Sequence, residues 1–308
     1  MAHRKSNAKI VSEKRRFVEA LRQFAATLPN MVTTLDGEWT VKGFIDVYKN
    51  IYTISSDTKI VSKILEIHLF PKILHLADRL EYSIVLAEHQ NWYPDLSLVN
   101  RKDESVKFAL DLKTTYRDPI HPGHANGFTL GSHGSYFRNR TSTKNVQFPY
   151  SAYAGHFCLG LIYSRADKNK IDEFGVTQVG ELKGDSHDRD STLDTVVEVS
   201  NLQSIASVIK DFEFFVCEKW QLASDRQGSG NTANIGSITY IEDIVRGHGV
   251  FAKLGEHVFD EYWMNYNVTT MLKAGKVTPI RRIEDFLEFK GGNPSLIVPM
   301  KTKRKGRK

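Results

Sequence analysis

The stretch WYPDLSLVNRKDESVKFALDLKTTY, Trp92 to Tyr116, decides the fold and carries the most informative polar residues of the chain. Its segments DLSLV and KFALDLKTT alternate apolar and polar residues, as half-buried strands do. The polar segment NRKDES between them is typical of a turn. The stretch therefore predicts two neighbouring strands that can pair as a hairpin.

The same alternation sorts the polar side chains by face. Successive side chains of a strand point to opposite faces, so Asp95 and Ser97 share one face of the first strand. Asp111 and Lys113 share one face of the second strand by the same rule. If the strands pair as a hairpin, Asp95 near the start of one lies close to Asp111 in the other. The prediction is a cluster of two carboxylates and one ammonium on rigid strands.

Phosphodiester hydrolysis is a reaction that needs these groups together. Carboxylates that hold Mg²⁺ allow a bound water to ionise near neutral pH and polarise a phosphate oxygen. A lysine two residues after one of the acids, as Lys113 is after Asp111, can orient water or stabilise the transition-state charge. The alternative is that Asp111 and Lys113 are partners on an exposed sheet face and hold no metal.

Upstream, the pattern predicts a helix over 11–28 that packs or dimerises, then short strands within 37–45 and 48–54. A long helix follows, with Ser56 or Asp57 as its cap and a bend or restart at Pro71. Glu66 lies beside the apolar stripe of this helix. On spacing alone it is either a surface carboxylate or a third acid directed at the cluster. The segment 83–87 reads as a further short strand.

Downstream, RQGSGNTANIGS at 226–237 combines three glycines with asparagine and threonine side chains. Glycines permit close backbone approach, and such a loop can present donors and acceptors to base edges in the major groove of DNA. The alternative is an ordinary surface turn. Helical patterns follow at 240–247 and 256–272, in which Val258 and Trp263 are expected to pack in the core.

Composition sets the outer bounds. The 308 residues are 41% hydrophobic, which is enough for one large or two smaller domains, and no apolar run is long enough to span a membrane. We therefore expect a cytoplasmic protein. The net charge of +6 fits a polyanionic partner, and the tail KTKRKGRK is either a solvated end or a source of phosphate attraction.

Three other features are given no part in the predicted activity. Cys158 and Cys217 lie in strand-like apolar runs without CxxC spacing, which favours buried core thiols. The HxxH pair of HPGHANG, His121 and His124, stands in a loop, and a metal role there is not expected. The segment 175–200 reads as an acidic surface insertion of unknown purpose.

Six motifs in order carry a resemblance over about residues 51–263. They are SDTK at Ser56, ILEI around Glu66, QNWYPD from Gln90, ALDLKTTY from Ala109, FTLGSHGSYFRN at 128–139 and GSGNTANIGSI at 228–238. Together they resemble the EcoRV-like family of type II restriction endonucleases, within the PD…(D/E)xK nuclease superfamily. The resemblance implies a mixed α/β fold, with a central mixed sheet flanked by helices and an interwoven DNA-recognition part.

The resemblance also assigns roles to residues. Asp95, Asp111 and Lys113 match the PD…(D/E)xK signature, and Glu66 matches an additional helix-borne acid linked to a second metal position. DNA-contact roles are implied for Lys59, Gln90, Asn91, Thr114, Thr115, Ser135, Lys144, Gly228, Ser229, Gly230, Asn231, Thr232 and Asn234. Extra residues in NRTSTKN make the match at Lys144 approximate, and Ala233 stands where the family has threonine.

The implied activity is Mg²⁺-dependent cleavage of double-stranded DNA by a homodimer. The expected site is GATATC or a close relative, cut centrally to blunt ends with 5′-phosphates, and the host would need a cognate DNA methyltransferase. The expected parts are an N-terminal dimerisation part (1–55), a catalytic core (56–165) and a recognition and C-terminal part (166–308). Two alternatives are a structure-selective repair nuclease, which should lack the base-reading loop, and a non-catalytic DNA-binding protein, which would not need both acids and the lysine.

Overall fold

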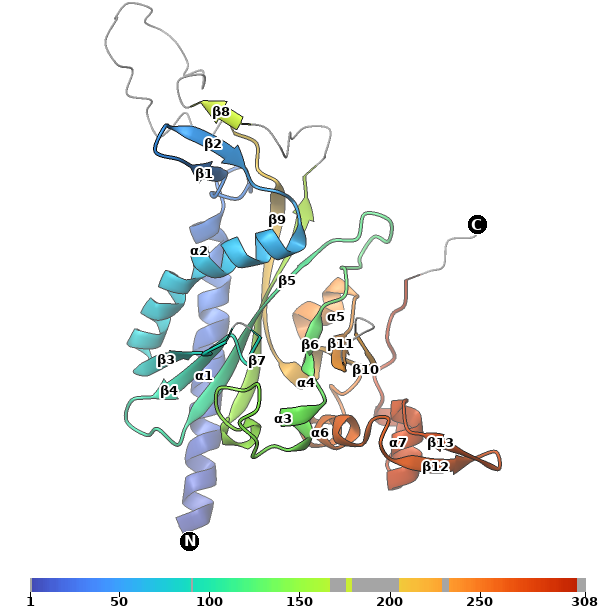
Figure 1. Cartoon of the computed structure of the whole chain (residues 1–308). Helices are drawn as coiled ribbons and strands as arrows, with labels where there is room; N and C mark the ends of the chain where they lie inside the picture. The colour runs from blue at the N-terminus through green and yellow to red at the C-terminus, as the bar shows by residue number, and fades with distance from the viewer. Residues whose placement is uncertain (1, 90, 167–175, 179–204, 229–232, 304–308) are drawn as a thin grey trace, which may run out of the picture.

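A mixed five-stranded sheet lies at the centre of the chain (Figure 1). The structure is a computed structural model that describes residues 2–89, 91–166, 176–178, 205–228 and 233–303. The strand order is β3-β4-β5-β7-β9, in which only the pair β5 and β7 is parallel. The strands of this sheet are β3 (Tyr82–Leu86), β4 (Leu96–Asn100), β5 (Lys107–Tyr116), β7 (Gly155–Arg165) and β9 (Ile209–Glu218). The predicted mixed α/β architecture is confirmed.

The hairpin predicted from Trp92–Tyr116 is present as β4 and β5. The strands pair antiparallel, with Ser97 opposite Ala109 and Leu98 opposite Phe108. This register places Asp95, one residue before β4, beside Asp111 on the same face of the sheet. The period-two argument from the sequence therefore fixed the relative position of the two acids correctly.

Two long helices pack on one face of the sheet. Helix α1 (Ala2–Val32) starts earlier and ends later than the predicted 11–28, and its Phe17 stacks on Phe108 of β5 with ring centroids 4.4 Å apart. Helix α2 (Thr58–Arg79) is capped by Asp57, whose side chain accepts hydrogen bonds from the amides of the first turn. Pro71 does not end α2, and the helix changes direction along its length (Figure 1).

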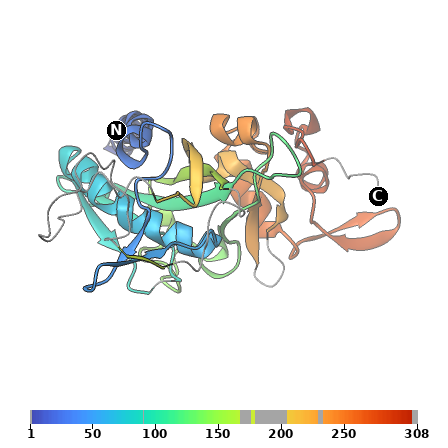
Figure 2. The ribbon, with the colours of Figure 1, turned by 90° about the horizontal axis from the view of Figure 1, so that it is seen from above.

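The opposite face of the sheet is covered by later parts of the chain, which form a second hydrophobic core rich in aromatic residues. Seen from above, the first helices and the C-terminal elements lie at opposite ends of the molecule (Figure 2). The helical elements on the C-terminal side are α3 (Ser135–Arg138), η1 (Tyr150–Ala152), α4 (Lys219–Leu222), α5 (Ile241–Arg246), α6 (Glu256–Asn265), α7 (Ile283–Lys290) and η5 (Pro294–Leu296).

Three smaller sheets complete the described fold. One has the order β1-β2-β8, the second β10-β11-β6, and the third is the hairpin β12-β13. Their strands are β1 (Gly43–Ile45), β2 (Asn50–Thr53), β6 (Thr129–Ser132), β8 (Val176–Gln178), β10 (Ala223–Gln227), β11 (Asn234–Ser237), β12 (Thr270–Lys273) and β13 (Lys276–Pro279). The two strands expected near the N-terminus thus exist, but they are shorter than the segments 37–45 and 48–54.

The helix predicted over 256–272 is wrong in its last part. Helix α6 ends at Asn265, and the chain then enters β12. Asn267 has a positive φ of 58°, a conformation that stops an α-helix, and the β-branched residues that follow favour a strand. Trp263 is fully buried in the second core, as expected.

The cysteine prediction is confirmed, because Cys158 and Cys217 are free, buried and opposite one another in β7 and β9. In the described part of the chain, no helix is both long and apolar enough to cross a membrane. The division at 55 and 165 stays a prediction. Apart from β8, the segment 175–200 lies outside the described residues.

Candidate active site

The β4–β5 hairpin brings the two acids and the lysine together. The Lys113 ammonium lies 3.1 Å from Asp111 Oδ2 and 3.9 Å from Asp95 Oδ2. The backbone amide of Asp95 points to Asp111 Oδ1 at 3.3 Å, and the amide of Leu112 donates to Asp95 Oδ2 at 2.8 Å. These bonds hold both carboxylates on the rigid strands. The cluster predicted from the sequence is therefore present as a geometric unit.

The two carboxylates of the cluster differ in solvent exposure. Asp111 is buried, whereas the Asp95 side chain is 36% exposed at the mouth of a cavity. The surrounding protein atoms partly desolvate the Asp95 carboxylate and raise its pKa to about 6, with Asp111 and Glu66 adding to the rise and Lys113 opposing it. Burial alone lowers the pKa of Lys113, but the Asp111 and Asp95 carboxylates outweigh it and hold this pKa above its ordinary value. The two carboxylates therefore favour the ammonium form of Lys113.

Glu66 reaches the same cavity from α2. This cavity has a volume of about 450 Å³, and its lining includes Glu66, Asp95 and Lys113. Glu66 is also paired with Lys63 one turn earlier in the helix. Lys59 lines the cavity as well, which places two α2 lysines near the acids. The structure therefore brings Glu66 to the cluster, while its role as a third acid stays a prediction.

The donor set suits a magnesium ion. Within the residues that the structure describes, no three His, Cys, Asp or Glu side chains meet closely enough to hold a metal. Mg²⁺ does not require three, because it keeps several waters and commonly binds through one or two carboxylates and a substrate phosphate. Asp95 and Asp111 both approach a single cation, the Lys113 ammonium. The pair fits such an ion.

A buried lysine behind the acids was missed by the sequence reasoning. Lys219 is 2% exposed, and its ammonium lies 4.5 Å from the ring centroid of Tyr93 and 5.3 Å from that of Tyr150. Its Nζ has no hydrogen-bond acceptor among the described residues. Burial lowers the pKa of Lys219 to about 8, and the nearby Asp111 partly opposes this. Only its place in the run FEFFVCEKW, just after a buried strand, hinted at burial.

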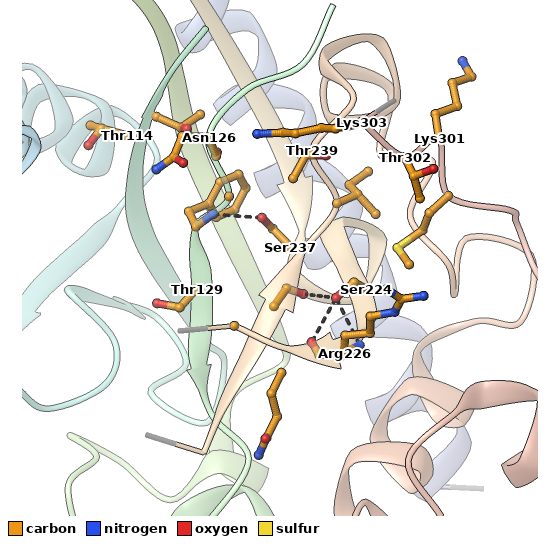
Figure 3. Close-up of a pocket in the computed structure, with 18 of the residues that line it drawn as sticks. Thr114, Asn126, Thr129, Ser224, Arg226, Ser237, Thr239, Lys301, Thr302 and Lys303 are labelled. Atoms are coloured by element: carbon orange, nitrogen blue, oxygen red, sulfur yellow. Dashed lines mark hydrogen bonds between the residues drawn. The ribbon is translucent and has the colours of Figure 1, made fainter. Parts of the chain in front are cut away.

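A larger cleft of about 780 Å³ opens beside the cluster (Figure 3). Thr114 lines both this cleft and the smaller cavity, so the two spaces adjoin at the end of β5. Thr115 also lines the cleft, but it is buried and its hydroxyl donates to the carbonyl of Asn126. Ser224, Arg226 and other residues of β10 and β11 form the opposite wall.

The glycine-rich stretch connects β10 to β11, which pair antiparallel. The amide of Gly228 donates to the carbonyl of Asn234 at 2.9 Å, which closes the loop at its base. Gly236 is required there, because a Cβ atom would stand 2.6 Å from the carbonyl oxygen of Arg226. The candidate loop residues Ser229, Gly230, Asn231 and Thr232 lie outside the described residues, as does Gln90.

The remaining candidates are more distant from the two spaces. Asn91, Ser135 and Lys144 line neither the cavity nor the cleft. The two histidines of the HxxH pair have separate hydrogen-bond partners: His121 Nδ1 lies 3.0 Å from Asp118 Oδ2, and His124 Nδ1 lies 3.2 Å from Thr239 Oγ1. The DNA-contact roles of Asn91, Ser135 and Lys144 stay predictions.

Two comparisons with known proteins both find similarity to the restriction endonuclease EcoRV. The profile of the family Restriction endonuclease EcoRV matches residues 35–198 and 185–291. The Type II restriction enzyme EcoRV of Escherichia coli is 33% identical over 251 residues, which cover 81% of this chain and 91% of that enzyme. Both matches include the β4–β5 hairpin and the β10–β11 loop.

Proposed function

Because the chain belongs to the EcoRV family of type II restriction endonucleases, we propose that it cuts double-stranded DNA at GATATC or a closely related palindrome. The cut falls at the centre and leaves blunt ends with 5′-phosphates. The observation that carries the proposal is that Asp95 and Lys113, with the buried Asp111 3.1 Å behind the Lys113 ammonium, line a cavity that adjoins a cleft walled by the β10–β11 hairpin.

The residues divide the work of phosphodiester hydrolysis. Asp95 and Asp111 would hold Mg²⁺, which supplies an acidified water and neutralises phosphate charge when bound. Lys113 would serve as a hydrogen-bond donor and charge stabiliser, because its ammonium lies beside both acids. Glu66 and Lys59 face the same cavity from α2 and are placed to act on the phosphate side.

The β10–β11 loop is the base-reading element of the proposal. A β-hairpin can enter the major groove, where each base pair presents its own donor and acceptor pattern. Thr114, Thr115, Ser135, Lys144, Asn91 and Gln90 are assigned to supporting contacts with the DNA. Ala233 stands where the family has threonine, and its methyl side chain offers no hydroxyl. One contact to the DNA therefore differs from the family's, and the recognition sequence can differ from GATATC.

A homodimer follows from a palindromic target, since each subunit then supplies one active site per strand. The surface that supports it lies on the β1–β2 hairpin and the loop before it. Leu35, Val47 and Tyr48 are almost fully exposed, and Phe44 and Ile45 are more than half exposed. Helix α1 instead packs its apolar face within its own subunit. Exposed apolar clusters of this kind mark association surfaces.

Cleavage of a plasmid with one GATATC site tests the proposal. Purified protein with Mg²⁺ should give one blunt double-strand cut at the centre of the site, and EDTA should stop it. Asp111→Ala should abolish cutting, whereas Glu104→Ala, an exposed acid in the turn of the same hairpin, should not. Discrete cuts at another sequence would overturn only the target, and undiminished cutting by Asp111→Ala would overturn the mechanism.

The dimer is tested by sedimentation. The wild type should sediment as a dimer, and Val47→Glu should shift it toward the monomer with loss of double-strand cutting. An unaltered dimer in the variant would place the interface elsewhere. We place the enzyme in the cytoplasm, together with a DNA methyltransferase that protects the host's own sites.

A further inference from the structure

The last described residues of the chain form part of the cleft wall. Met300, Lys301, Thr302 and Lys303 line the 780 Å³ cleft, opposite the end of β5 (Figure 3). The segment is held in place by apolar packing of Ile297 and Met300 on the second core, and by a hydrogen bond from Val298 N to Val250 O. The match to the family profile ends at residue 291, before this wall.

The cleft is lined by positive and neutral groups. Its described lining includes Arg226, Lys301 and Lys303 together with serine, threonine and asparagine side chains. No aspartate or glutamate is among these lining residues. A cleft with this lining suits a polyanion, because cations in a confined space strengthen the attraction for phosphate.

Lys303 points into the cleft. Figure 3 shows its side chain extending from the C-terminal segment toward Asn126 and Thr239. Its ammonium lies 2.6 Å from Asp118 Oδ2, and the Lys303 side chain is 31% exposed. Asp118 also accepts hydrogen bonds from the amides of Ile120 and His121, and its Oδ2 lies 3.0 Å from His121 Nδ1, so its carboxylate is held in place.

Lys301 points away from the cleft centre and anchors the segment. Its ammonium lies 3.9 Å from the centroid of the Tyr240 ring and 3.4 Å from Asp243 Oδ1 of α5. Figure 3 shows this side chain directed away from Lys303. The two lysines of the segment therefore have different surroundings, since Lys301 packs against α5 outside the cleft and Lys303 lines the cleft, where it is paired with Asp118.

We propose that Lys303 is a phosphate-contacting residue of this enzyme, held by Asp118 in the free protein and transferred to a DNA backbone phosphate in the complex. The proposal rests on the DNA cleavage proposed above and extends its binding surface. Asp118 keeps the amides of Ile120 and His121 and the His121 ring as partners when Lys303 leaves, so the transfer of Lys303 to a phosphate leaves no carboxylate unpaired. Phosphate contacts carry no sequence information, so Lys303 adds affinity and leaves the recognition sequence unchanged.

The test is the salt dependence of binding to a short duplex that lacks GATATC, measured by fluorescence anisotropy in EDTA. Each phosphate contact adds about 0.9 to the slope of log affinity against log salt. Lys303→Gln should lower the slope by about that amount, so between 50 and 200 mM salt its affinity should fall about 3.5-fold less than that of the wild type. Lys102→Gln is the matched control, because Lys102 also holds one surface carboxylate, Glu81, but lies at the turn of the β4–β5 hairpin.

A second variant tests the exchange. Asp118→Asn removes the competing carboxylate and keeps Lys303, so it should bind the duplex more tightly than the wild type with an unchanged slope. The phosphate contact would be overturned if Lys303→Gln kept the wild-type salt slope, or if its slope fell by no more than that of Lys102→Gln. Weaker binding by Asp118→Asn would overturn the exchange and leave Asp118 as a support for Lys303. A wild type that binds duplex without ever cutting it would instead overturn the proposed function, whatever the slopes.

Discussion

Gly160 is the position at which one added methyl group tests how the core supports the candidate active site. In the sheet register, Gly160 of β7 lies between Lys113 of β5 and Phe215 of β9. A Cβ atom at residue 160 would stand 1.9, 2.3 and 2.5 Å from three carbon atoms of the Phe215 ring. Ordinary carbon–carbon contacts are about 3.5 Å or longer, so the buried ring would have to move by roughly 1.6 Å.

The size of the effect follows from two opposing contributions. Overpacking a filled core costs about 1–3 kcal/mol, and alanine in place of a strand glycine recovers about 0.5–1 kcal/mol of chain entropy. We expect Gly160→Ala to lower the free energy of unfolding by about 1–2 kcal/mol. Cleavage should slow as well, because the ring that must move fills the space beside the strand position of Lys113.

The assay is urea unfolding at one protein concentration, combined with a double-mutant cycle. Phe215→Leu removes ring atoms from the contact, so the double variant should be more stable than the sum of the two single changes predicts, by about 1 kcal/mol or more. It should also recover part of the lost cleavage rate. If the two costs simply add, the steric reasoning is refuted.

Three further changes have defined outcomes. Lys219→Met should raise the free energy of unfolding at pH 7, because it removes a buried ammonium. The pKa of Lys219 is about 8 in the folded protein and 10.5 in the unfolded chain, so the stability of the wild type should rise between pH 8 and pH 10.5. Urea midpoints of the variant should lack that rise. Asp57→Ala should cost about 1 kcal/mol through loss of the α2 cap, and Asp57→Asn much less, in the same urea assay. Gly236→Ala should disturb the β10–β11 hairpin at the Arg226 carbonyl, and cutting of a plasmid library should show weaker discrimination between GATATC and its one-base variants.

The parts of the fold that sequence predicts well are those set by local periodicity. The alternation in Asp95–Val99 and 107–115 determined both the strands and their facing acids, and a cap followed by apolar residues determined the start of α2. The same reasoning failed after Asn265, because a single residue with positive φ changes the direction of the chain and periodicity does not detect it. Hydrophobic periodicity therefore predicts regular helices and strands, and it does not predict where a single residue ends one.

The parts of the site that sequence could not supply are those made by long-range packing. Lys219 enters the aromatic surroundings of Tyr93 and Tyr150 only after three distant segments meet, and nothing next to it in sequence is charged oppositely except Glu218. The contact between Lys303 and Asp118 spans 185 residues. Such pairs have no spacing rule, so only the assembled structure can show them.

The acids lie at the boundary of two hydrophobic cores, so contacts set by local strand pairing and contacts made by long-range packing meet at this site. Phe108 and Leu110 of β5 face the first core, whereas Ala109 and Asp111 face the second, so β5 belongs to both. The strand is therefore held from each side before its polar end, Lys113 and Thr114, reaches the cavity and the cleft. A change in either core moves the same strand, which is why Gly160→Ala, made on the side of the second core, is expected to affect stability and cutting together.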